Sequence, residues 1–312
     1  MKLATGLAAG GLDPFSGVGH MLSHPFIVRA LLSGGVVAAA CGLIGYFLVL
    51  RAQVFAGDAL SHVAFTGALA ALAAGIDLRV GLFAACIAFA CAIGLLGTRE
   101  RSDDVLIGNL FAWVLGLGAL LLTVYASRSG AGRTGVTVLF GSVFGISPSQ
   151  ALVTALTGVG VIAVALLIAR PLLFASLDEA AAAAAGVPAR LIGLIFIVLV
   201  GITAGEATQV VGSLLVLGLL AGPAATAHLL AGDPWRGVVV SVTSAVLSMW
   251  LGVAFAYLAP RLPVSFCVLA VSTAGYLAAA LWRRVPRPTA ADRVGGSRSF
   301  GSRRGRAVRG PA

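Results

Sequence analysis

Lysine is almost absent from this sequence, because Lys2 is the only lysine among 312 residues. A phosphate-binding P-loop requires the pattern G-x-x-x-x-G-K followed by Ser or Thr, in which the lysine contacts the nucleotide phosphates. No glycine loop precedes Lys2, so this chain cannot supply a P-loop. Any use of ATP must therefore come from a partner protein.

Charged residues are also scarce. Only 10% of the residues are Asp, Glu, Lys or Arg, whereas 59% are apolar, and the mean hydropathy is +1.04. A soluble protein of this length needs far more polar surface, so the composition predicts an integral membrane protein whose surface faces lipid. Residues 1–19 lack the basic, apolar and cleavage-site order of a signal peptide, so we expect the first spanning helix to direct membrane insertion.

Cysteine is rare and never occurs in a close pair. None of the four cysteines belongs to a C-x-x-C motif, and each lies inside an apolar run: Cys41, Cys86, Cys91 and Cys267. Thiolate zinc sites use closely spaced cysteines. We therefore predict that these four residues are small, buried apolar side chains.

Long apolar runs make up most of the chain. A membrane-spanning helix needs about 20 mostly apolar residues. We predict an all-α fold, a polytopic transmembrane helical bundle of about eight or nine spanning helices, with the domain divisions 1–25 (N-terminal segment, outside), 26–282 (transmembrane domain) and 283–312 (tail). The nine candidate spans are 26–50, 57–75, 80–97, 105–125, 150–170, 189–205, 208–230, 237–259 and 263–282.

The C-terminal tail is the most basic part of the chain. Nine of the 21 Lys and Arg residues follow Trp282, in a stretch rich in Arg, Gly, Ser and Pro. This stretch has too few apolar residues to form a core, so we expect it to be disordered. We expect it to lie against anionic lipid headgroups and not to bind nucleic acid. Because positive charge favours the cytoplasmic side, the tail is predicted inside and the N-terminus outside.

Glycine and proline mark one late span, "LVLGLLAGPAATA". Gly218 and Gly222 are four residues apart, and small residues at this spacing allow close packing between helices. Pro223 follows directly and predicts a kink or a break in the helix. Such a break is tolerated at membrane depth where it faces protein or a water-filled cavity.

The stretch "GDALSHVAFTG" (57–67) places a carboxylate and an imidazole in an apolar surrounding. Asp58 and His62 are four residues apart, so on a helix they share one face and can turn toward one cation. A charge at the bilayer centre is costly, and such residues often have a function. Imidazole with carboxylate suits zinc, manganese or ferrous iron. Alternatively, Asp58 caps the helix while Ser61 and His62 satisfy backbone groups, or the pair forms a proton relay.

Other candidates are weaker. His20 and His24 are also four residues apart but precede the first span, immediately before Pro25. Glu206 is predicted in a short outer turn, "GITAGEATQ", as an outer gate or as a solvated turn residue. His228 lies near the inner end of its span, where it is expected to be a packed interface residue.

Four blocks together resemble the permease subunits of ATP-binding-cassette importers for zinc, manganese and iron. The first contains the G-D-A-x-S-H run and the basic residue Arg51, although Ala52 stands where a second basic residue is expected. The resemblance covers about residues 22–282, and its blocks are "PFIVRALLSGGVVAAACGLIGYFLVLRAQVFAGDALSHVAFTG" (25–67), "VLFGSVFGISPSQ" (138–150), "LDEAAAAAAGVPARLIGL" (177–194) and "VVGSLLVLGLLAGPAATAHLL" (210–230).

The resemblance implies a role for each matched residue. Asp58 and His62 would line the translocation path as ligands of the cation, with zinc or manganese as the expected ion. Asp178, Glu179 and Gly186 would lie in a short cytoplasmic helix that docks on the ATPase subunit. The implied assembly is a homodimer in the bacterial plasma membrane, with two ATPase subunits inside and an extracytoplasmic metal-binding protein outside. No permanently bound cofactor is expected, because the metal ion is the cargo.

The function expected from the sequence is therefore ATP-driven import of a divalent transition-metal ion, with the ATPase site in another subunit. One alternative is a proton-coupled secondary metal transporter that acts without an ATPase. Another is an intramembrane metal-dependent hydrolase. The hydrolase requires a fuller ligand set, and the chain has no H-E-x-x-H run or comparable pattern.

Overall fold

The computed structural model describes residues 25–96, 103–126, 139–141, 143–145, 147–259 and 261–284. Within these ranges the chain is helical and has no strand. Its main elements are α2 (Pro25–Leu50), α3 (Val54–Ala73), α4 (Leu78–Leu96), α5 (Asp103–Ala126), η1 (Val143–Gly145), α7 (Pro148–Leu177), α8 (Glu179–Ala184), α9 (Ala189–Val210), α10 (Val216–Leu230), α11 (Pro234–Leu258) and α12 (Val264–Arg284).

The predicted all-α transmembrane bundle is confirmed. In the described part of the chain, eight helices are long and apolar enough to cross a membrane, and α10, with 15 residues, is shorter. The nine predicted spans correspond in order to these nine helices. The N-terminal segment with His20 and His24, and the basic tail beyond Arg284, lie outside the described residues.

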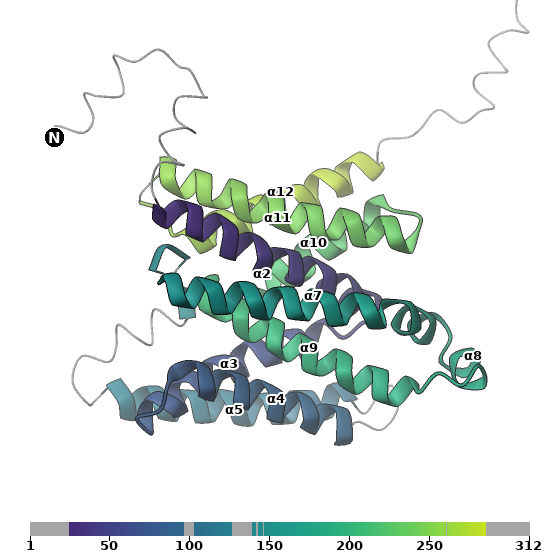
Figure 1. Cartoon of the computed structure of the whole chain (residues 1–312), viewed down its shortest axis with the longest axis horizontal. Helices are drawn as coiled ribbons and strands as arrows, with labels where there is room; N and C mark the ends of the chain where they lie inside the picture. Colours follow the sequence, from purple (N-terminus) through teal and green to yellow (C-terminus); the bar gives the residue numbers. More distant parts are fainter. Residues whose placement is uncertain are drawn as a thin grey trace, which may run out of the picture.

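The helices form three neighbouring groups (Figure 1). α10, α11 and α12 lie on one side, α3, α4 and α5 lie on the other, and α2, α7 and α9 lie between them. Most of α2, α3 and α9 is buried, whereas α5 and α7 are mostly exposed. Their exposed side chains include Trp113, Leu120, Leu156 and Leu167. Such an apolar exterior is stable against lipid, as expected for a multi-pass protein of the cell membrane.

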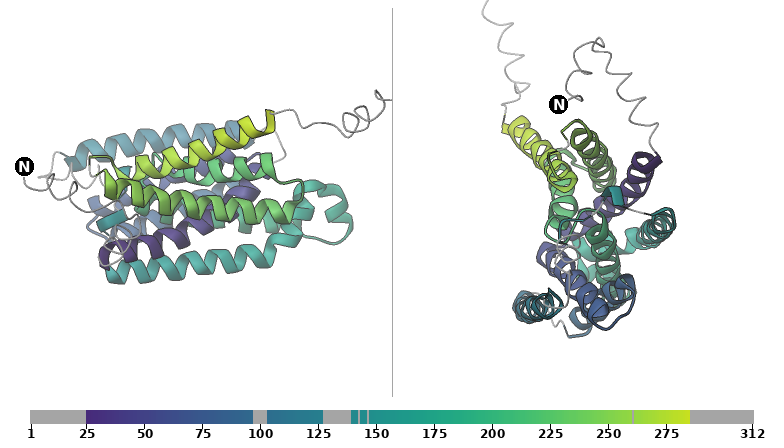
Figure 2. Two further views of the ribbon diagram at one scale, coloured as in Figure 1. Left: turned by 90° about the horizontal axis from the view of Figure 1, so that it is seen from above. Right: turned by 90° about the vertical axis from the view of Figure 1, so that its left-hand side faces the viewer.

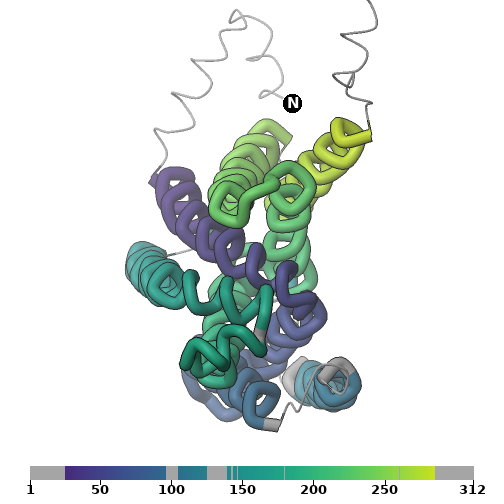
Figure 3. The backbone as a smooth tube through the Cα atoms, turned by 90° about the vertical axis from the view of Figure 1, so that its right-hand side faces the viewer, coloured from purple at the N-terminus to yellow at the C-terminus, as the bar shows by residue number. Residues whose placement is uncertain are grey.

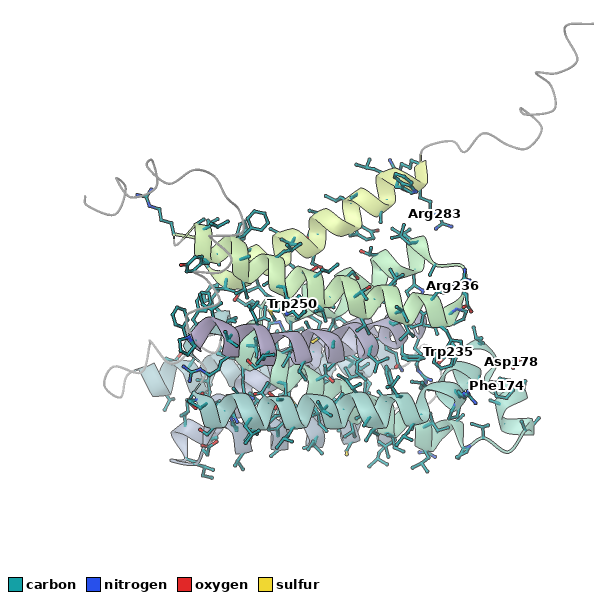
Figure 4. The ribbon with its side chains drawn as sticks, turned by 45° about the horizontal axis from the view of Figure 1, so that its top comes forward. Phe174, Asp178, Trp235, Arg236, Trp250 and Arg283 are labelled. Atoms are coloured by element: carbon teal, nitrogen blue, oxygen red, sulfur yellow. The ribbon has the colours of Figure 1, made fainter. Side chains whose placement is uncertain are left out.

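The two ends of the bundle are told apart by the short helix α8, which lies at one of them (Figure 1). The first described helix starts at one end and α12 finishes at the opposite end (Figure 2). Asp178, Trp235, Arg236 and Arg283 lie together at the end that carries α8 (Figure 4), which we call the α8 end. Basic residues and tryptophan at one end are typical of a membrane interface. α12, which the basic tail follows in the sequence, finishes at this end (Figure 2), so this is the end that the sequence predicts to face the cytoplasm.

The backbone is not helical between α9 and α10, at residues 211–215. Gly212 has a φ of +95°, and Gly141 has a φ of +73° in the segment that crosses it. A Cβ atom on either glycine would collide with the backbone of the other segment. Of the two alternatives predicted at Pro223, a kink or a break, the break is wrong in position. Pro223 lies inside α10, because the backbone turns upstream of it, where glycine permits the turn.

The predicted small-residue pair in α10 packs against α12. A Cβ on Gly218 would collide with Leu269, and one on Gly222 would collide with Ser272. The Ser272 hydroxyl donates to the Gly218 carbonyl oxygen at 3.1 Å. These glycines therefore allow close helix packing, as expected where no hydrophobic force drives helices together.

Candidate cation site on α3

A tight turn joins α2 to α3. Ala52 has a φ of +54°, and the backbone N–H groups of Ala52 and Gln53 donate to the carbonyl oxygens of Val49 (3.1 Å) and Leu48 (2.9 Å). This is the pattern of a Schellman motif, which ends a helix with one residue in the left-handed region. Because the turn takes only three residues, α3 begins at Val54, earlier than the sequence predicts.

Asp58 lies in the second turn of α3. The N-cap residue of this helix is Gln53, which makes no side-chain capping hydrogen bond. The predicted capping role of Asp58 is therefore wrong. Asp58 and His62 are both half-buried on a continuous helix, so they share one face as predicted.

The neighbours of the pair come from two different elements. Ser61 donates from its hydroxyl to the carbonyl oxygens of Asp58 (2.7 Å) and Ser213 (3.1 Å), which fixes α3 to the interruption at 211–215. The His62 ring faces Phe111 of α5, with 5.4 Å between the ring centroids. Asp58 and His62 thus lie on the part of α3 that packs between α5 and the non-helical backbone.

The site offers few side-chain ligands. Among the described residues, no group of three or more His, Cys, Asp or Glu side chains is placed to hold a metal ion. Asp58 and His62 can supply one oxygen and one nitrogen, and the other ligands of a four- or six-coordinate ion must be water, backbone carbonyls or groups from another chain. An incomplete set of ligands suits an ion that binds and leaves.

Cysteine contributes no such ligand pair. Cys41, Cys86 and Cys267 are buried, Cys91 is half-buried, and all four are free. The Cys86 thiol lies 3.6 Å from the Leu60 carbonyl oxygen. The prediction of buried, small side chains holds for three of them.

Glu206 lies inside α9 and is 2% exposed, so the prediction of a solvated turn is wrong. Neither carboxylate oxygen has a hydrogen-bond partner. The residues around this buried carboxyl group include Thr154 and Thr157 on α7 and Arg79 on α4. The sequence did not single out these neighbours of Glu206, because three separate helices bring the residues together.

Arg79 stands at the end of the bundle opposite α8. Its backbone N–H donates to Asp77 Oδ1 at 2.8 Å, at the start of α4. Its side chain is half-buried, and its buried Nε has no hydrogen-bond partner. The sequence analysis did not select Arg79; its place beside Asp77 at the start of an apolar run is the signal that could have found it.

The segment predicted to dock on an ATPase forms a short exposed helix. Asp178 is the N-cap of α8, and its Oδ1 accepts a hydrogen bond from the Ala181 N–H at 2.9 Å. Glu179 is the first residue of α8, and Gly186 follows the helix with a φ of +80°. The three residues are therefore brought together at the α8 end of the bundle.

His228 of α10 is a packed interface residue. Its ring stacks on Tyr46, with 4.5 Å between the centroids and 9° between the planes. Its Nε2 lies 3.2 Å from the Tyr46 carbonyl oxygen. This contact joins α10 to α2 and does not reach the Asp58 region.

Comparisons with known proteins agree with this architecture. The model of the ABC 3 transport family matches residues 23–283. The chain belongs to this family. The family resemblance drawn from the four sequence blocks is thereby confirmed, since the matched range contains all of them.

Two curated relatives illustrate the family. The chain is 32% identical over 258 residues to the manganese transport system membrane protein MntC of Halalkalibacterium halodurans, across 81% of this chain and 86% of that protein. It is 27% identical over 239 residues to the chelated iron transport system membrane protein YfeD of Yersinia pestis, across 76% and 79%.

A solved structure shares the fold. The chain superposes with a TM-score of 0.73 on a chain of PsaBC from Streptococcus pneumoniae in complex with Fab. The match covers 85% of this chain and 94% of that chain, at 24% identity. The helical arrangement described above is therefore shared with that chain.

Proposed function

We propose that this chain is the membrane-spanning permease of an ATP-driven importer for divalent transition-metal ions. The observation that carries the proposal is the Asp58–His62 pair, which shares one face of the buried helix α3 in a family of ABC transport proteins. A carboxylate and an imidazole in a membrane helix are costly unless they bind something. A cation that passes through the bilayer provides that reason.

The chemistry of the two side chains limits which metal ions the site can bind. Oxygen and imidazole nitrogen suit manganese, zinc and ferrous iron, and the pair includes no thiolate. Two relatives of this chain are named for the transport of manganese and of chelated iron. Manganese or zinc is the proposed cargo, and Mn²⁺ is the first ion to test.

The proposed motor is a separate ATPase subunit, because this chain has no P-loop. Its docking surface is α8, where Asp178 and Gly186 are exposed and Glu179 is the first residue of the helix. An extracytoplasmic metal-binding protein would deliver the ion at the opposite end. A second copy of the chain would complete the translocation path, which is consistent with the incomplete set of ligands in one copy.

Glu206 is proposed as the outer gate. Its buried carboxyl group faces Thr154 and Thr157 and lies within electrostatic reach of Arg79, at the end where the ion would enter. Glu206→Gln keeps the side-chain shape and removes the charge. It should slow metal uptake without changing the affinity of the complex for Mn²⁺, and an unchanged uptake rate would leave Glu206 as a packing residue only.

The decisive test is Mn²⁺ uptake into liposomes that contain the chain with its ATPase and binding protein. Asp58→Asn and His62→Ala should each abolish uptake while thermal unfolding and ATPase assembly stay as in the wild type. Asp233→Asn is the matched control, since Asp233 is exposed and makes no side-chain capping bond. Normal uptake by both site variants would remove the proposed cation role.

Liposomes that contain the chain without an ATPase distinguish ATP-driven import from proton-coupled secondary transport. The chain without an ATPase should take up no Mn²⁺ when a proton gradient is imposed. Uptake under these conditions would replace the proposed mechanism with proton coupling, in which Asp58 and His62 relay protons.

A further inference from the structure

Arg51 connects three separate helices at the α8 end. It lies in the turn between α2 and α3, and its side chain is half-buried. Its Nε donates to Gln53 Oε1 and its Nη1 donates to Ser176 Oγ, both at 3.4 Å. Its guanidinium carbon lies 5.8 Å from the centroid of the Phe196 ring, within the range of a cation–π contact.

The residues that Arg51 contacts lie next to α8 in the sequence or at the start of α3. Ser176 stands two residues before Asp178, the N-cap of α8, whereas Phe196 lies in α9, the helix that follows α8. Gln53 is the N-cap of α3, the helix that carries Asp58. One side chain therefore contacts both helices that flank α8 and the residue that starts α3. Figure 3 shows the backbone viewed from this α8 end of the bundle.

The partners of Arg51 are themselves held in place. The Ser176 hydroxyl donates to the Leu172 carbonyl oxygen at 2.5 Å, which leaves its lone pairs to accept from Arg51. The Phe196 ring is fully buried and packs edge to face on Phe47, one turn before Arg51 in α2, at 6.5 Å between centroids. A movement of the α7 and α9 ends therefore acts on Arg51 through fixed groups.

We infer that Arg51 is a positioning residue that transmits movement of α8 to the cation site on α3. This inference rests on the proposed function, since it assigns the link between ATPase docking and the Asp58–His62 pair. Asp58 follows Gln53 by five residues, which is about 7.5 Å along the helix axis. A displacement of the α3 start therefore reaches the cation ligands within the same rigid helix.

The chemistry of the link requires arginine. The planar guanidinium donates in two directions within its plane while its face lies against an aromatic ring. A lysine at position 51 would keep the charge but has a single donor group that cannot make the three contacts at once. The proposal therefore predicts different behaviour for Arg51→Gln and Arg51→Lys.

The test measures Mn²⁺ ions transported per ATP hydrolysed by the reconstituted complex of permease, ATPase and binding protein. Arg51→Gln should lower this ratio about tenfold, in the upper range for coupling residues. Its ATPase rate, its assembly and its KM for Mn²⁺ should stay near wild type, and Arg51→Lys should fall in between. Arg170→Gln, an exposed arginine on α7, is the control for loss of charge and should keep the wild-type ratio.

The outcomes distinguish this inference from the proposed function. A wild-type ratio in Arg51→Gln, or a raised KM with an unchanged ratio, would overturn the role of Arg51 alone. A wild-type complex that transports no metal would overturn the proposed function and this inference with it. If Arg51→Gln fails to assemble, Ser176→Ala replaces it, since it removes one contact of Arg51 and should lower the same ratio.

Discussion

The hydroxyl of Ser61 donates a hydrogen bond to the carbonyl oxygen of Ser213, and the two oxygen atoms are 3.1 Å apart. Both residues are 1% exposed or less. The bond joins α3, next to the proposed cation ligand His62, to the non-helical backbone between α9 and α10. Two features far apart in the sequence are thereby fixed to each other at the candidate site.

Replacement of Ser61 by alanine tests this connection. The change leaves the buried Ser213 carbonyl oxygen without this donor, so the free energy of unfolding should fall by about 1–3 kcal/mol. Thermal unfolding of the purified protein in detergent measures the loss. The control is Thr243→Ala, because Thr243 is exposed and its hydroxyl bonds only within its own helix. Equal effects of the two substitutions would contradict the prediction.

Gly212→Ala should disturb the crossing of residues 210–212 and 139–141. A Cβ at Gly212 meets the Leu139 carbonyl oxygen and the backbone of Phe140, and the φ of +95° disfavours alanine. The expected loss of unfolding free energy is about 3 kcal/mol or more. Gly160→Ala on α7 is the control, because a Cβ there meets no atom within 4 Å. A stable Gly212→Ala protein with unchanged uptake would show that this crossing is adaptable.

Ala52→Gly should stabilise the protein. Ala52 holds a φ of +54°, a left-handed conformation that costs an alanine roughly 1 kcal/mol and a glycine almost nothing. The midpoint of thermal unfolding should therefore rise. The same substitution at Ala70, an exposed position inside α3, should lower the midpoint because glycine weakens a helix interior. The prediction fails if both substitutions shift the midpoint in the same direction.

Asp178→Ala should weaken the association with the ATPase. The substitution removes the hydrogen bond to the Ala181 N–H and costs the start of α8 about 1 kcal/mol. Copurification of the ATPase with the permease measures the effect. Asp233→Ala is a matched control, since Asp233 is also an N-cap at the α8 end but its side chain makes no capping bond. Equal recovery of ATPase with both variants would count against docking at α8.

The transmembrane class and the order of the helices could be predicted from the sequence, because apolar runs of sufficient length follow one another with polar breaks. The start of α3 could not be placed, because the turn at Ala52 lacks the glycine that usually marks such a helix end. Asp58 therefore looked like a cap, whereas the helix starts at Val54. The shared face of Asp58 and His62 was predictable, since it depends only on helical spacing.

The surroundings of Glu206 show the limit of local patterns. Glu206, Thr208 and Gln209 form a polar stretch between two apolar runs, which is also the pattern of a solvated turn. The backbone instead stays helical to Val210 and turns at Gly212. Contacts such as those of Arg51 with Ser176 and Phe196 depend on tertiary packing across more than 100 residues, so the sequence pattern contains no signal for them.

The shortness of α10 has a consequence for how the protein enters the membrane. A helix of 15 residues is about 22 Å long, whereas the hydrocarbon core of a bilayer is about 30 Å thick. We therefore expect α10 to be a poor independent span. It packs against α2, α11 and α12, so we expect these three helices to hold the segment beside the candidate cation site in the membrane.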